Sequence, residues 1–158
     1  MRRLLAAGIA ILAAGTVGAI VASRQPEPVT PLVSGVADDT AVGGVLARSC
    51  QDCHSDRTRR PWYGHIPPVS WLLDSDIGEA RSHMDFSRWS KYSTDDKRQI
   101  LTSIAANVRN SQMPPGRYLM MHPDARLSAE EIAWICAWTR SERRRLRAEA
   151  ARAGGDAR

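Results

Sequence analysis

The chain has 158 residues, of which 43% are hydrophobic and 25% charged, and its formal net charge is +5. This length fits one domain of ordinary size with a modest apolar core. The basic excess lies at the chain ends: residues 140–158 hold seven arginines and three acids, whereas residues 24–139 hold 13 basic and 14 acidic side chains. Because the body of the chain is nearly neutral, we expect no nucleic-acid partner.

The N-terminal residues predict export. Arg2 and Arg3 precede an uninterrupted apolar run from Leu4 to Ala22. As a helix this run would be about 28 Å long, close to the hydrocarbon thickness of about 30 Å, which favours a signal anchor over residues 1–23. The segment ends in Val-Ala-Ser, which also suits a cleaved signal peptide. We expect the remaining chain on the periplasmic side of the bacterial inner membrane, anchored, or free in the periplasm after cleavage.

Residues 24–37 contain three prolines and show no apolar period, which predicts a linker. A helical pattern begins at Asp38 and leads into the segment around the first two cysteines. The apolar positions of this pattern are Val42, Val45, Leu46 and Cys50. Residues 55–69 are rich in Arg, Gly and Pro and therefore predict a loop.

Three further helices follow in the pattern. The second begins at Ser70, with apolar positions Leu73, Ile77, Ala80 and Met84. The third is capped at Ser93 and ends near Asn110, because the Met-Pro-Pro-Gly sequence after it cannot continue a helix. The last begins at Ser128, which forms a capping box with Glu131. No segment alternates as a strand does, so we predict an all-α domain with long loops over residues 38–140, followed by a basic tail over residues 141–158.

Cys50, Cys53 and His54 form a C-x-x-C-H motif, and three chemistries use such residues. A structural zinc site needs four ligands, and the chain has no second cysteine pair or closely spaced histidine pair. A dithiol redox site would open a helix in a βαβ context, which this chain lacks. Covalent haem needs only these residues, and export places them where haem c is attached. We therefore predict one haem c, bound through Cys50 and Cys53, with His54 as the proximal iron ligand.

Met113 is the leading candidate for the sixth iron ligand. It precedes two prolines, which favour a rigid extended loop, and it lies 59 residues after His54, enough chain to surround a haem. A thioether ligand favours ferrous iron and raises the reduction potential. The alternatives are that Met113 only fills a gap in the core, that His83 or His122 binds the iron, or that the sixth position is open.

Further motifs carry a resemblance to known proteins. These motifs are Pro61-Trp62-Tyr63, Ile66, Pro68-Val69-Ser70-Trp71, His83, Asp85-Phe86-Ser87, Trp89, and Met113-Pro114-Pro115 with Tyr118, His122 and Pro123. Together with C-x-x-C-H they resemble the bacterial haem-binding domain family. The order of a helix, the motif, a Met-Pro loop and a last helix of the type L-S-x-E-E-I-x-x-x-x-x-W is similar to class I cytochrome c.

The resemblance implies a cytochrome c-like fold around one covalent haem, in which the first and last helices cross. Leu46 should then meet Trp138 or Ile135. It also implies that a carbonyl of Ile66 or Pro67 accepts a hydrogen bond from the second ring nitrogen of His54.

Several side chains outside the motif also have expected positions. Trp62, Trp71 and Trp89 are expected to line the haem, the alternative being ordinary core positions. His65 stands where an asparagine is more usual, and we expect it to be an exposed loop residue. Cys136, on the apolar face of the last helix, is expected to be a buried free thiol.

These features predict an exported monohaem c-type cytochrome that passes single electrons to redox partner proteins through an exposed haem edge. Such a protein needs no catalytic side chains, so we predict that it is not an enzyme. The main alternative is a haem enzyme, or a sensor of gas or peroxide, with an open or histidine-ligated sixth position. A third possibility is a structural or adaptor module that the haem only stabilises.

Overall fold

Residues 40–156 are the part of the chain that the computed structural model describes, and they form helices with no strand among them. The all-α prediction is confirmed for this part. The predicted signal anchor over residues 1–23 and the predicted linker over residues 24–37 lie outside the described residues. Among the described helices, none combines the length and the hydropathy that a membrane span requires.

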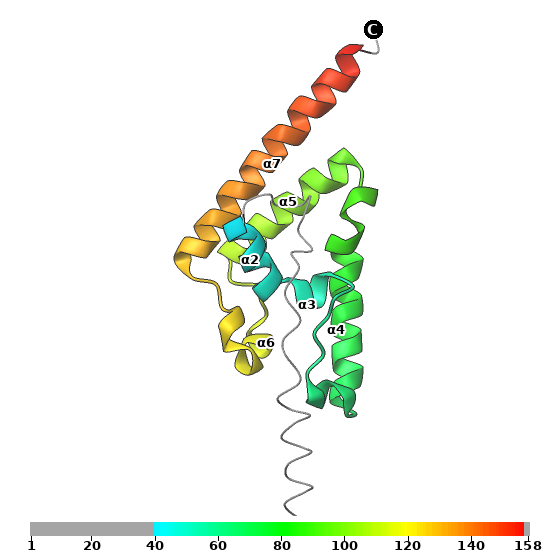
Figure 1. Cartoon of the computed structure of the whole chain (residues 1–158), viewed down its shortest axis with the longest axis vertical. Helices are drawn as coiled ribbons and strands as arrows, with labels where there is room; N and C mark the ends of the chain where they lie inside the picture. The colour runs from blue at the N-terminus through cyan, green and yellow to red at the C-terminus, as the bar shows by residue number, and fades with distance from the viewer. Residues whose placement is uncertain (1–39, 157–158) are drawn as a thin grey trace, which may run out of the picture. The chain divides into compact units, whose positions relative to one another are not determined.

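The helices follow the predicted order with additions (Figure 1). They are α2 (Thr40–Ser49), α3 (Gln51–His54), α4 (Val69–His83), α5 (Thr94–Arg109), α6 (Gly116–Met121) and α7 (Ala129–Asp156), with the short 3-10 helices η1 (Trp62–His65), η2 (Phe86–Lys91) and η3 (Pro123–Ala125) between them. Four of these, η1, η2, α6 and η3, lie between the helices that the sequence predicts.

Helix α5 begins where its sequence predicts. The Ser93 Oγ accepts a hydrogen bond from the Asp96 backbone N–H at 3.1 Å, and the Asp96 carboxylate accepts one from the Ser93 N–H at 3.3 Å. This capping box satisfies two N–H groups that would otherwise lack partners at the helix start. The helix then buries Leu101, Ala105 and Val108 on one face.

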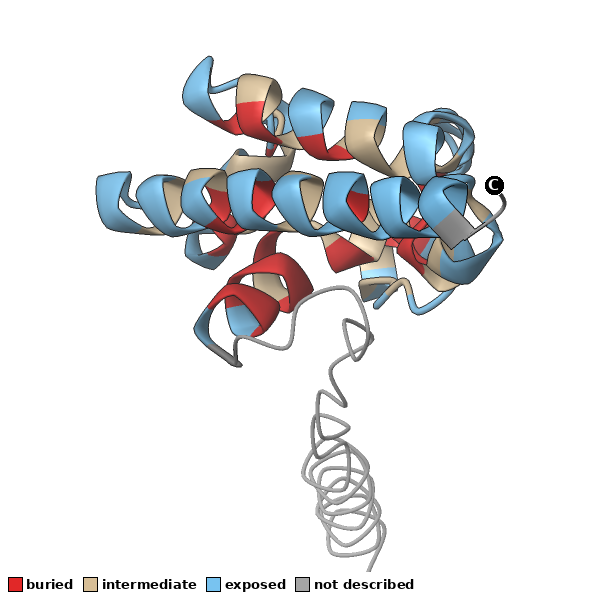
Figure 2. Ribbon diagram, turned by 90° about the horizontal axis from the view of Figure 1, so that it is seen from above, coloured by how far each residue is buried: buried red, intermediate tan, exposed pale blue. Residues whose placement is uncertain are grey.

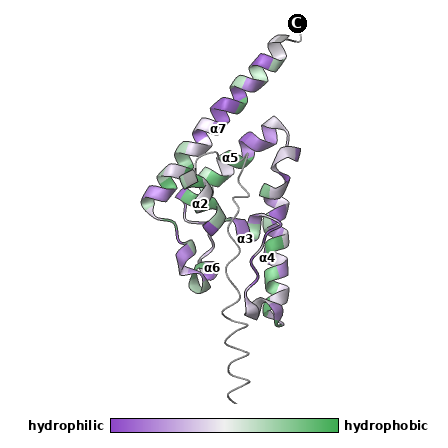
Figure 3. Ribbon diagram, in the orientation of Figure 1, coloured by the Kyte–Doolittle hydropathy of each residue, from purple (hydrophilic) through white to green (hydrophobic). Residues whose placement is uncertain are grey.

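Helix α7 is longer than predicted. Its predicted capping box is present, because the Ser128 N–H donates to the Glu131 carboxylate at 2.8 Å and the Glu131 N–H donates to Ser128 Oγ at 3.1 Å. Residues 141–156, predicted as a basic tail, continue α7 without a break. Two features stabilise this extension: Leu146 is buried in the core, and Arg145 pairs with Glu142 and Glu149 one turn away on either side. Figure 3 colours much of this part of α7 purple, so its outer surface is hydrophilic.

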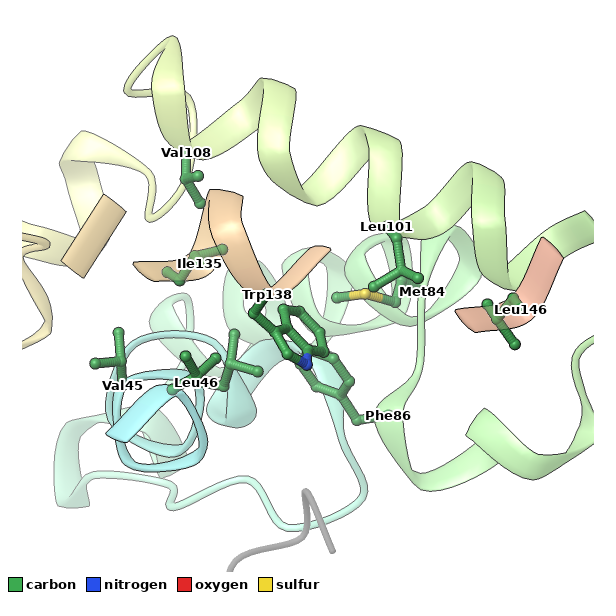
Figure 4. Close-up of a cluster of buried hydrophobic side chains, with 10 residues drawn as sticks. Val45, Leu46, Met84, Phe86, Leu101, Val108, Ile135, Trp138 and Leu146 are labelled. Carbon is green, nitrogen blue, oxygen red and sulfur yellow. The ribbon is translucent and has the colours of Figure 1, made fainter. Parts of the chain in front are cut away.

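The core lies where α2, α5 and α7 meet, and buried residues concentrate on the sides of the helices that face one another (Figure 2). Leu46 shares one buried cluster with Ile135 and Trp138, as Figure 4 shows, so the predicted meeting of these residues is found. The Arg48–Glu131 ion pair, at 2.8 Å, also joins α2 to α7. This packing fixes the end of α2, and with it the start of the cysteine motif.

Two minor predictions concern single residues. Cys136 is a free thiol whose Sγ lies 3.9 Å from the Ala105 carbonyl oxygen, and it is half-buried rather than fully buried. His65 is exposed in η1, as predicted.

Candidate functional site

A cavity of about 1040 Å³ lies beside the cysteine motif. Its lining includes all four predicted site residues: Cys50, Cys53, His54 and Met113. Small-molecule sites in proteins span about 300–1,000 Å³, so this cavity has room for a large flat cofactor. The structure thus brings together residues that lie up to 63 positions apart in the sequence.

The backbone of the motif explains how three of these side chains reach the same cavity. Helix α2 ends at Ser49, and the Cys50 N–H still donates to the Leu46 carbonyl at 2.9 Å. The single turn of α3 follows, with the His54 N–H donating to the Cys50 carbonyl at 3.0 Å. Both thiols are free. The turn therefore presents two thiols and an imidazole to one space.

The imidazole of His54 is oriented by the backbone at the end of α4. Its Nδ1–H donates to the carbonyl oxygen of Met84 at 3.0 Å, which leaves Nε2 as the nitrogen with a lone pair. The prediction that Ile66 or Pro67 supplies this carbonyl is therefore wrong. Those two residues precede the first turn of α4, whereas His54 lies near its last turn. Burial lowers the pKa of His54, so the ring is neutral and able to bind a metal.

The two thiols are protonated at neutral pH. Burial, and to a smaller extent the nearby Cys53, raises the pKa of Cys50 to about 12. Burial also raises the pKa of Cys53. Burial thus favours the neutral thiol over the thiolate at both cysteines.

The remaining walls of the cavity are mostly apolar. They include Leu46, Leu73, Ile77, Phe86, Ile100 and Val108. An apolar slot with one neutral imidazole and two thiols at its edge is the donor set that a covalently attached haem requires. The residues present therefore fit the predicted cofactor.

A polar network closes the side of the cavity that α6 forms. The Tyr118 hydroxyl donates to the Asp52 carboxylate at 3.0 Å, and Arg59 Nε donates to the same carboxylate at 3.1 Å. Asp52 is one of the two residues between the cysteines, so the network links the motif directly to α6. Burial raises the pKa of Tyr118, which keeps its hydroxyl protonated as a donor.

His122, a competing candidate for the sixth ligand, has hydrogen-bond partners in the protein at both ring nitrogens. Its Nδ1–H donates to the Tyr118 carbonyl at 3.2 Å, and its Nε2 accepts from the Tyr63 hydroxyl at 3.4 Å. Its ring also stacks on Tyr118, with the centroids 4.2 Å apart. His83, the other candidate, is exposed at the edge of the cavity.

Two methionines in the cavity lining were not predicted as site residues. Met84 is buried, and Met121 is exposed in α6. Met84 stands at the last apolar position of the second predicted helix, where the pattern indicates core, and Met121 lies in a helix that the sequence did not predict. The apolar pattern alone therefore could not separate them from ordinary core or surface positions.

The expectation that three tryptophans line the haem is wrong. Trp62 and Trp71 are largely exposed, and Trp89 packs against the hydrophobic core cluster. None of the three is among the residues that line the cavity. The reason is position: Trp62 and Trp71 lie in η1 and the first turn of α4, at the end of the domain, with their rings in solvent.

The chain is similar to known proteins over most of its length. The sequence pattern of a family described as a haem-binding domain matches residues 12–141, which is most of the chain. The chain belongs to the haem-binding domain family. Membership of this family establishes that the chain is a haem protein. The cavity beside the C-x-x-C-H motif has the space and the donor side chains that this cofactor needs.

One curated relative is a cytochrome c peroxidase, Ccp, of Escherichia coli (strain K12). This chain is 28% identical to the peroxidase over 143 residues, which is 87% of this chain and 31% of the peroxidase. The chain thus spans about a third of the length of that relative. No solved structure matches the chain at a comparable level of significance.

Proposed function

We propose that this protein carries one haem c, attached through Cys50 and Cys53, with His54 as the proximal and Met113 as the distal iron ligand, and that it transfers single electrons. The observation that carries the proposal is the common cavity, lined by all four side chains, in which the bond from Nδ1 to Met84 leaves His54 Nε2 as the metal-binding atom. Haem iron supplies a one-electron couple when bound.

The chain's own residues tune such a couple. The hydrogen bond from His54 to a backbone carbonyl fixes the ring's tautomer and orientation. The apolar walls exclude water, and the thioether of Met113 favours the ferrous state. The Tyr63 hydroxyl is hydrogen-bonded to His122 Nε2. This pairing suits a structural role in the cavity wall better than proton transfer.

The apolar run from Leu4 to Ala22 supports a location on the periplasmic side of the inner membrane, anchored, or in the periplasm if the run is cleaved. In that compartment the partners would be redox proteins that accept or donate one electron.

A second candidate function is a haem enzyme or a sensor of gas or peroxide. The observation that favours it is the similarity to part of a cytochrome c peroxidase. In this case Met113, which is partly exposed, would not bind the iron, and Tyr63 and His122 in the same cavity would be the candidate proton donor and acceptor.

One experiment distinguishes the two. The full chain is produced with haem c maturation, and the ferric protein is examined for the near-infrared band of a methionine–iron bond. The electron carrier predicts that the band is present, is lost in Met113→Ala, and persists in Met121→Ala, which removes another thioether from the same cavity. Absence of the band, with rapid CO binding by the untreated ferrous protein, would favour the enzyme or sensor.

A further inference from the structure

An exposed apolar tip lies at one end of the domain. We use "apolar tip" for residues 61–73, which form η1, the Pro-Pro turn and the first turn of α4. Its exposed large apolar side chains are Trp62 (73% exposed), Ile66 (52%), Val69 (38%), Trp71 (68%) and Leu72 (53%). Isolated apolar residues on a surface are ordinary, but two tryptophans and three aliphatic side chains exposed within eleven residues indicate an interaction site. Figure 1 places this end away from the C-terminal end of α7.

The apolar tip is also free of formal charge. Its thirteen residues contain no Asp, Glu, Lys or Arg, although a quarter of the whole chain is charged. The first charges on either side are Arg60 and Asp74, and these two form an ion pair. This ion pair therefore lies at the boundary between the apolar tip and the rest of the domain, which carries the charged residues.

Contacts within the domain hold the apolar tip in its conformation. Arg60 donates a second hydrogen bond to the Gly64 carbonyl at 2.9 Å. Gly64 is buried so closely against α4 that a Cβ at this position would lie 2.8 Å from Leu73 Cδ1. A side chain at this position would therefore require Leu73 and Arg60 to shift. The exposed rings are thus held outward on a fixed support.

A haem in the cavity would leave the two tryptophans and Ile66 of this surface uncovered. Trp62, Ile66 and Trp71 do not line the cavity, so a cofactor there would not bury them. Val69 and Leu72 belong both to the tip and to the cavity lining. A partner that covers Trp62, Ile66 and Trp71 is therefore separate from the haem. Such a partner would lie next to the edge of the cavity.

We propose that the apolar tip inserts into the interfacial region of a phospholipid bilayer. Tryptophan favours the headgroup level, and aliphatic side chains favour the acyl boundary below it. The absence of any formally charged side chain in residues 61–73 favours this occupant, because a charge is costly to move from water into an apolar environment. The inference rests on the proposed anchoring: the apolar run ends at Ala22, and the 17 residues that follow before Thr40 span at most about 60 Å. An anchored chain therefore keeps the start of the domain within about 60 Å of a bilayer.

The test uses the full haem-loaded chain in vesicles of phosphatidylethanolamine and phosphatidylglycerol that contain a phospholipid with a photoreactive acyl chain. After illumination, mass spectrometry locates the lipid adducts. The proposal predicts adducts within residues 61–73. They should fall several-fold in Trp62→Ser/Trp71→Ser and in Ile66→Asp, and should persist in the control Trp134→Ser, which changes a partly exposed tryptophan on α7. An unchanged haem spectrum shows that each variant is folded.

The outcomes separate this inference from the proposed location. Adducts in residues 4–22 without adducts in residues 61–73 would overturn the inference and support the anchor. Adducts in residues 61–73 without any in 4–22 would support the inference and refute the anchor. If residues 61–73 carry no lipid and instead crosslink to a second copy of the chain or to another protein, the tip is a protein interface and the inference is overturned.

Discussion

The His54 imidazole is held by a main-chain atom, and this has a consequence for the residue that provides it. Met84 contributes its carbonyl oxygen to His54 and its buried side chain to the cavity wall and the core. Only the first of these contributions depends on the backbone alone. The side chain can therefore be changed without moving the hydrogen bond.

We predict that Met84→Leu leaves the haem spectrum and the methionine–iron band unchanged. The backbone carbonyl stays in place, and a swap of similar volume in a core costs below about 1.5 kcal/mol in the free energy of unfolding. Absorption spectroscopy and denaturant unfolding check the two parts. Loss of the band in this variant, with its retention in Met113→Ala, would make Met84 the distal ligand and contradict the assignment to Met113.

At the scale of elements, α6 is placed by polar contacts rather than by burial. None of its six residues is buried. Tyr118 bonds to Asp52 in the motif, and Arg117 pairs with Asp76 of α4 at 2.8 Å. Because α6 directly follows the Met113-Pro114-Pro115 segment, these contacts also hold the end of the loop that carries the proposed distal ligand.

We predict that Tyr118→Phe raises the affinity of the ferric protein for added imidazole by about tenfold, which equals about 1.4 kcal/mol. A hydrogen bond to a charged group contributes about 1.5–3 kcal/mol, and its loss frees α6 and weakens the hold on Met113. Titration followed by absorption measures the affinity. The control is Tyr92→Phe. The Tyr92 hydroxyl accepts a hydrogen bond from the Asp85 N–H, and Tyr92 lines the same cavity without a hydrogen bond to α6. Equal affinities in wild type and Tyr118→Phe would show that α6 does not hold the loop.

The start of α7 gives a prediction that depends on pH. The Ser128 backbone N–H lowers the pKa of Glu131, and Arg48 lowers it further. A carboxyl group with a lowered pKa stabilises the folded state above its unfolded value of 4.5, and this contribution is lost as the pH falls through the lower folded value. We predict that Glu131→Gln reduces the free energy of unfolding by up to about 1 kcal/mol at pH 7, and that the difference from wild type shrinks in acid.

Denaturant unfolding at several pH values measures this difference. The matched control is Glu130→Gln, which removes an exposed carboxylate from the same turn of α7. A loss in Glu131→Gln that stays constant down to acid pH would contradict an origin in the charge.

The elements that the sequence predicted well are those with local signals. Both capping boxes, at Ser93 and Ser128, follow from residues three positions apart, and both are found. Helix α6 was missed because it is short, follows Pro115, has no side-chain cap and buries nothing. The continuation of α7 was missed because it depends on the burial of Leu146 against distant residues.

The candidate site also has a part that the sequence predicts and a part that it does not. The thiols and imidazole of the motif are neighbours in the sequence, so their common position in the structure could be predicted. The carbonyl partner of His54 lies 30 residues away, and no pattern in the sequence distinguishes Met84 from Ile66 or Pro67. The direction of Trp62 and Trp71 depends on how η1 packs on α4, which residue type does not encode.

At the scale of the whole molecule, the helical frame is arranged around one cavity. The α2–α7 contact fixes the start of the motif, α4 supplies the acceptor for His54, and the segment from Met113 through α6 closes the other side. The cavity beside the C-x-x-C-H motif is thus the feature that these elements share.

The central claim is that haem is bound to this chain by two thioether bonds. The most direct measurement is extraction of the purified, exported full chain with acidified organic solvent, followed by absorption spectroscopy of the protein and the solvent. With two thioether bonds the pigment stays with the protein, and it moves into the solvent, or is absent, in Cys50→Ala/Cys53→Ala. A wild-type protein that is colourless, or that releases its haem to the solvent, would contradict the account.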